Sequence, residues 1–152
     1  MTKGFIYSIA IASMAMAGSA FAGPIAPDDV KFTDMKVMES LTGQPGDAAE
    51  GRKLFANKKK GNCLACHVDS DLKDQLFHGN IGPSLDEVAD RYSPEELRAI
   101  VVDSKQAISP ETVMPGFYSM HVGKNVAEEF VGKTILSAQE VEDVVAYLTT
   151  LK

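Results

Sequence analysis

Apolar residues recur at helical spacing in two segments of the chain, and each segment opens with a helix-start signal. Ser93 and Pro94 are followed by Glu96, which combines an N-cap serine, a proline in the first turn and the glutamate of a capping box. Ser137 and Glu140 repeat the capping-box spacing. The apolar positions that follow are Leu97, Ile100 and Val101 in the first segment and Val141, Val144, Val145 and Leu148 in the second. The pattern predicts two amphipathic helices that bury these positions in a core.

A third helix is predicted from Asp47 to about Lys58. Asp47 is a favourable N-cap residue, and Glu50 follows three positions later. The face of this helix expected in the core carries Gly51, Leu54 and Phe55.

The first 22 residues have the layout of a secretory signal peptide. Lys3 precedes an apolar run, which ends in the small-residue pattern Ala20-Phe21-Ala22, and cleavage is expected after Ala22. A membrane anchor is the alternative, but serines and a glycine interrupt the run, and a spanning helix needs roughly 20 apolar residues. We therefore expect an exported chain with no membrane span in its mature part.

The mature part is long enough for one compact domain. Residues 23–46 contain prolines and aspartates without periodicity, which predicts an extended N-terminal arm, either frayed or docked on a partner. At most a short helical piece is expected around Asp34 to Leu41. Residues 47–152 are then the folded domain.

The formal charge of the chain is −6, and cleavage would remove Lys3 but no acidic residue. An acidic surface argues against nucleic acid or an anionic membrane as a partner. The basic run Lys58-Lys59-Lys60 allows two interpretations: a solvated helix end favoured by the macrodipole, or a docking patch.

Both cysteines fall in the run Cys63-Leu64-Ala65-Cys66-His67, the C-x-x-C-H pattern of covalent haem attachment. Two cysteines on one turn can each add to a haem vinyl group, and the imidazole of the next residue then points at the iron. A thioredoxin-like dithiol would need a βαβ pattern, whereas no alternating strand precedes Asn62. A zinc site would need His67 together with distant histidines. The pattern therefore predicts one haem c, with His67 as an iron ligand.

Met114 is the expected ligand on the other side of the iron. Pro115 follows it, restricts Met114 to extended backbone and stiffens the loop that presents the sulfur. A thioether ligand favours ferrous iron and raises the reduction potential, which suits an electron acceptor. If Met114 is not this ligand, Met120 and then His121 are the next candidates. His78 is expected to be exposed or locally hydrogen-bonded.

Five features together resemble the class I cytochrome c fold, an all-α domain wrapped around one haem: a helix with Gly51 and Phe55, the C-x-x-C-H run, Gly82-Pro83, Met114-Pro115, and a terminal amphipathic helix with Tyr147-Leu148. The likeness covers most of Asp47 to Lys152. At finer grain the chain resembles the SoxX family of bacterial sulfur-oxidation cytochromes. The runs that carry this resemblance are Gly61-Asn62-Cys63-Leu64-Ala65-Cys66-His67, Gly79-Asn80-Ile81-Gly82-Pro83, Arg91-Tyr92 and Thr112-Val113-Met114-Pro115-Gly116-Phe117-Tyr118.

The resemblance implies a role and a set of partners. The chain would be the small subunit of a periplasmic SoxAX complex, paired with a SoxA-like dihaem or monohaem cytochrome subunit. That complex joins thiosulfate to a cysteine of the carrier protein SoxYZ and passes electrons to a soluble cytochrome c. The resemblance also assigns the axial ligands to His67 and Met114, and makes the carbonyl of Pro83 the acceptor that orients His67.

Two other functions remain open at this point. A free-standing periplasmic electron carrier would share the fold and the haem. A thiol oxidoreductase would use Cys63 and Cys66 directly. If both cysteines hold haem, neither thiol is left to act as a nucleophile, and the sulfur chemistry must occur on a partner.

Overall fold

The computed structural model describes residues 23–152, so the predicted signal peptide lies outside the described residues. The helices in this range are α1 (Ala48–Ala56), α2 (Val88–Arg91), α3 (Pro94–Ala107) and α4 (Ala138–Leu148). Short 3-10 turns cover Pro27–Asp29, Cys63–Ala65, Ser70–Leu72 and Glu128–Phe130. Extended pairing within residues 23–152 amounts to one isolated bridge between Thr33 and Lys36. The prediction of an all-α fold is therefore confirmed.

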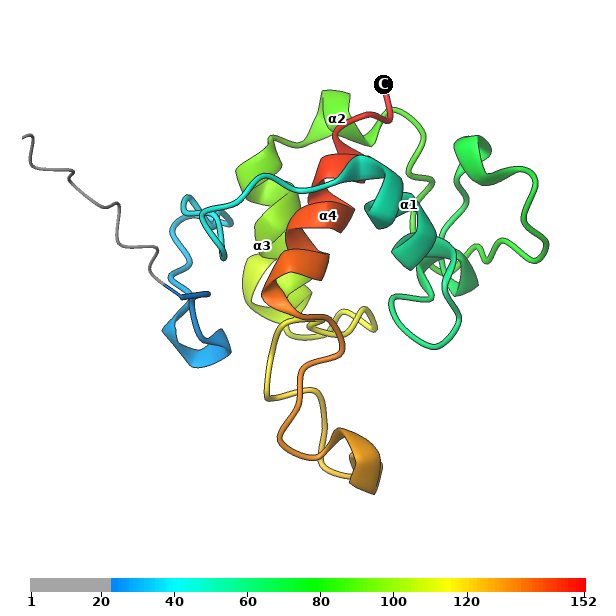
Figure 1. Ribbon diagram of the computed structural model, residues 1–152. Helices are drawn as coiled ribbons and strands as arrows, with labels where there is room; N and C mark the ends of the chain where they lie inside the picture. Colours follow the sequence, from blue (N-terminus) through cyan, green and yellow to red (C-terminus); the bar gives the residue numbers. More distant parts are fainter. Residues whose placement is uncertain (1–22) are drawn as a thin grey trace, which may run out of the picture.

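α1 and α4 cross at the centre of the molecule, and α3 packs beside α4 (Figure 1). Gly51 makes the close crossing possible, because a Cβ at this position would lie 1.9 Å from the main-chain oxygen of Asp143. One turn further along, the buried rings of Phe55 and Tyr147 meet edge to face with centroids 5.7 Å apart. This aromatic contact fixes α4 against the helix that leads into the cysteine turn.

The helix starts follow the sequence signals. Capping boxes are present at Ser93 of α3 and at Ser137 of α4. At α1 the carboxylate of Asp47 accepts the N–H groups of residues 49 and 50, and the helix ends at Ala56, slightly before the predicted end at Lys58. A feature the periodicity did not predict is a break inside α3 at Asp103, where φ is −156° and ψ is 95°.

The expectation of a frayed or partner-docked arm is wrong for the second half of residues 23–46. Val37 and Leu41 are 2% and 0% exposed and belong to the core of this chain. The predicted helical piece around Asp34 to Leu41 is also absent, and this stretch instead contains the Thr33 bridge and turns. The N–H of Val37 donates to the carbonyl of Glu95 in α3, and the N–H of Leu41 donates to the carboxylate of Glu142 in α4, which no local pattern could indicate.

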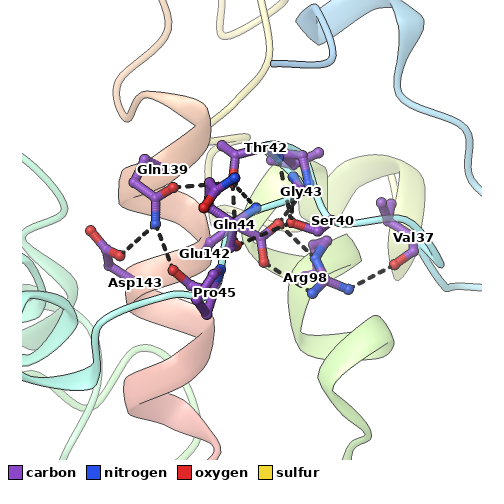
Figure 2. Close-up of polar contacts among 11 residues, drawn as sticks. Val37, Ser40, Thr42, Gly43, Gln44, Pro45, Arg98, Gln139, Glu142 and Asp143 are labelled. Atoms are coloured by element: carbon purple, nitrogen blue, oxygen red, sulfur yellow. Dashed lines mark hydrogen bonds and ion pairs between the residues drawn. The ribbon is translucent and has the colours of Figure 1, made fainter. Parts of the chain in front are cut away.

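A buried ion pair between α3 and α4 holds this segment in place (Figure 2). The guanidinium of Arg98 donates to both carboxylate oxygens of Glu142 at 2.9 and 3.0 Å, and to the carbonyl of Val37 at 3.1 Å. The same carboxylate accepts the N–H of Leu41 at 2.8 Å. The pair therefore binds two main-chain groups of the segment while joining the two helices.

No helix within residues 23–152 is both long enough and apolar enough to cross a membrane.

Candidate haem site

The two cysteines and the histidine of the motif lie on one tight turn. Asn62 enters the turn with a left-handed φ of 49°. The N–H groups of Cys66 and His67 both donate to the carbonyl of Cys63, at 3.1 and 3.0 Å. Both thiols are half-buried and free of any disulfide in the described part of the chain. The turn thus presents two thiols and one imidazole from consecutive positions of a single loop.

The environment of Cys63 is unlike that of a redox-active dithiol. Burial of this side chain raises the pKa of its thiol to about 12. A reactive cysteine needs a lowered pKa, because the thiolate is the nucleophile. The raised pKa of the Cys63 thiol therefore disfavours the thiol oxidoreductase.

The imidazole of His67 is oriented by the loop around Pro83. Nδ1 of His67 lies 2.7 Å from the carbonyl oxygen of Pro83. A carbonyl only accepts, so Nδ1 carries the proton and Nε2 keeps its lone pair for a metal. Gly82 packs against the ring, since a Cβ there would lie 2.3 Å from its Cε1 atom. The contact fixes both the tautomer and the plane of the imidazole.

The loop of residues 79–83 is held on the cysteine turn by its main chain. The N–H of Gly79 donates to Leu64 at 2.7 Å, and the N–H of Gly82 donates to Cys66 at 2.8 Å. A Cβ at Gly79 would lie 2.0 Å from the carbonyl oxygen of Ala65. Glycine at both positions is what allows the loop to approach the turn and deliver the Pro83 carbonyl.

A polar contact from α4 supports the segment that follows His67. The hydroxyl of Tyr147 lies 2.7 Å from Oδ2 of Asp69, which is 0% exposed, and 3.0 Å from Oδ2 of Asp71. Burial, followed by the two carboxylates, raises the pKa of Tyr147. The sequence pattern did not predict this contact. Its one local indication is that a tyrosine lies on the buried face of α4.

Met114 lies on a different loop, after α3. Its side chain is half-buried and packs against the core. Its carbonyl accepts the hydroxyl of Ser104 at 2.8 Å, and its N–H donates to Oγ1 of Thr112 at 3.3 Å. The main chain on both sides of Met114 is therefore tied to its surroundings.

Comparisons with known proteins identify the family of this chain. The family model "Cytochrome c" matches residues 48–152. Among solved structures, the chain is similar to one in the crystal structure of SoxXA from P. pantotrophus, with 40% identity and a TM-score of 0.79. The match covers 85% of this chain and 98% of that chain. The chain belongs to the SoxX family of cytochromes c. The search of curated sequences gave no match.

SoxX-family cytochromes carry a single haem c, and the residues of this chain fit that group. Cys63 and Cys66 are free thiols at the attachment spacing, and the Nδ1 contact of His67 leaves Nε2 to bind iron. Ile81 and Val113, in the segments just before Pro83 and Met114, expose 69% and 78% of their surface. Exposed apolar side chains beside Met114 and beside the carbonyl that orients His67 fit a planar apolar group.

The other soft donors of this SoxX-family chain lie in different surroundings. His78 is half-buried and bonded locally, with Nε2 3.1 Å from the carbonyl of Leu72 and Nδ1 3.3 Å from the N–H of Asp69. His121 is exposed and lies 3.6 Å from a carboxylate oxygen of Asp28. His78 is thus occupied by main-chain partners, as its position suggested.

Proposed function

We propose that this SoxX-family cytochrome is the electron-accepting subunit of a periplasmic SoxAX-type complex. The observation that carries the proposal is the 40% identity to a chain of SoxXA, spanning 98% of that chain. The complex oxidatively couples thiosulfate to a cysteine of the carrier protein SoxYZ. Electrons pass through a SoxA-like subunit to this chain and then to a soluble cytochrome c. Residues 1–22 act as the export signal for this location.

The residues of the site have distinct tasks in this proposal. Cys63 and Cys66 would hold the haem through thioether bonds, and His67 and Met114 would bind its iron. The haem would supply reversible uptake of one electron. The carbonyl of Pro83 accepts a hydrogen bond from Nδ1–H of His67, which fixes the tautomer, increases the donor strength of the imidazole and stops the ring from rotating.

The sulfur chemistry belongs to the partner subunit. The chain has two cysteines, and thioether formation uses both of their sulfurs. No thiol then remains to attack thiosulfate or to carry a sulfane sulfur. The role left to this subunit is to accept and pass on one electron at a time.

Isolation of the native complex tests the proposal. Purification by an affinity tag at Lys152 should also isolate a larger haem-containing subunit. The two chains should then elute together from gel filtration in a ratio of one to one. The matched control is the same preparation from cells that lack the larger subunit. A tagged chain that elutes as a monomer in both preparations would instead support the free-standing carrier.

A further inference from the structure

The break in α3 lies directly beside the loop that carries Met114. Asp103 has extended backbone within the helix, and its carboxylate accepts the N–H of Lys105 at 3.1 Å. This is the geometry of an N-cap: the side chain of Asp103 caps a new helical turn that starts at Ser104. In an unbroken helix the N–H of Lys105 would bond to the carbonyl of Val101 instead.

The main chain of the Met114 loop uses the carbonyls around the break. The N–H of Phe117 donates to the carbonyl of Val101, and the N–H of Tyr118 donates to the carbonyl of Val102, both at 3.1 Å. In Figure 1 this part of the chain, in yellow, turns back beneath the lower end of α3. The two bonds dock the segment just after Met114 on the helix.

Two side chains of the new helical turn bind the main chain at Met114 and just before it. The buried hydroxyl of Ser104 donates to the carbonyl of Met114 at 2.8 Å, and Nζ of Lys105 donates to the carbonyl of Thr112 at 2.5 Å. Gly116 lies against the capping residue, because a Cβ there would be 3.0 Å from Cγ of Asp103. Both flanks of Met114 are therefore fixed by one interruption of one helix.

We propose that the break in α3, capped by Asp103 and completed by Ser104, is a positioning device for the Met114 sulfur. The inference rests on the proposed role of Met114 as an iron ligand. A thioether is a weak, neutral donor, so its occupancy at iron depends on how little freedom its loop loses on binding. Asp103 and Ser104 act through the loop and do not touch the metal.

Competition between added imidazole and Met114 for the iron of the ferric holoprotein tests the inference. Imidazole must displace the methionine, so its apparent affinity reports how firmly Met114 is held. Loss of one hydrogen bond in Ser104→Ala should tighten imidazole binding about fivefold. Ser119→Ala is the matched control, because Ser119 is also buried in this loop but accepts the N–H of His121. The control should titrate as the wild type does.

The capping residue allows a conservative rescue. Asp103→Ala removes the cap and should tighten imidazole binding about tenfold, because the helix can then continue and recapture its own carbonyls. Asp103→Asn keeps an oxygen that accepts the N–H of Lys105 and should stay within about twofold of the wild type. If Asp103→Ala does not fold, Ser104→Ala against its control still decides the question.

Met114→Ala separates the two proposals. If this variant keeps the weak far-red band of ferric iron bound to methionine sulfur, the ligand assignment fails and the inference falls with it. If Met114→Ala loses the band while Ser104→Ala and Asp103→Ala titrate like the Ser119→Ala control, the ligand stands and the positioning inference is overturned.

Discussion

Replacing Arg98 by methionine should destabilise the protein strongly, although the residue lies away from the cysteine turn. The side chains of Arg98 and Glu142 are 11% and 5% exposed, and they form a bidentate pair (Figure 2). Arg98→Met keeps most of the apolar length of the side chain but leaves the Glu142 carboxylate buried without its cation. It also leaves the carbonyl of Val37 without a donor. Removing one partner of such a pair costs about 3 to 5 kcal/mol of unfolding free energy.

Urea unfolding of the ferric holoprotein, followed by far-ultraviolet circular dichroism, measures this cost. Lys53→Met is the control, because it breaks the exposed ion pair with Glu50 and should leave the midpoint unchanged. Glu142→Gln should cost less than Arg98→Met, since the amide oxygen can still accept the N–H of Leu41. A loss below about 1 kcal/mol for Arg98→Met would refute the reasoning, because the buried carboxylate would then need no cation.

Three further substitutions test other parts of the structure. Gly51→Ala forces α1 and α4 apart and should cost about 2 kcal/mol or more in urea unfolding; an unchanged midpoint would contradict the close crossing. Gly82→Ala should rotate the His67 ring out of its contact with Pro83, weaken the imidazole as a donor and raise the reduction potential in a redox titration, whereas a wild-type potential would show that the contact is not needed. The N–H and hydroxyl of Ser70 lower the pKa of Asp86 below its ordinary 3.8, so stability is retained above that value and lost as the pH falls below it. Asp86→Asn should weaken this acid dependence in thermal unfolding at pH 3 to 5, and an identical pH profile would exclude the Ser70 contact as its source.

The helix starts and the cysteine motif could be predicted because their determinants are local. A capping box joins residues three positions apart, so Ser93 and Ser137 mark α3 and α4 without any knowledge of the rest of the fold. The C-x-x-C-H run likewise contains the whole attachment turn. The sequence placed Gly51 on the core-facing side of its helix. The structure shows why the residue is glycine: the main chain of α4 lies too close for a side chain.

The docked segment, the tyrosine contact and the helix break depend on partners far along the chain. Leu41 shares Glu142 with Arg98, and Tyr147 lies 78 residues from Asp69. No periodicity in residues 23–46 indicates burial, because that burial is supplied by helices that come later. An aspartate inside an amphipathic pattern could equally have faced solvent at the surface of an unbroken helix.

Electron delivery to this haem is the central claim, and anaerobic reduction of the purified ferric protein tests it most directly. With SoxYZ and the larger haem subunit present, thiosulfate should reduce the haem attached at Cys63 and Cys66, as followed in the visible spectrum. Omitting the larger subunit should abolish the reduction, since this chain has no thiol left for sulfur chemistry. A haem that stays ferric in the complete mixture, yet is reduced readily by dithionite, would contradict the assignment.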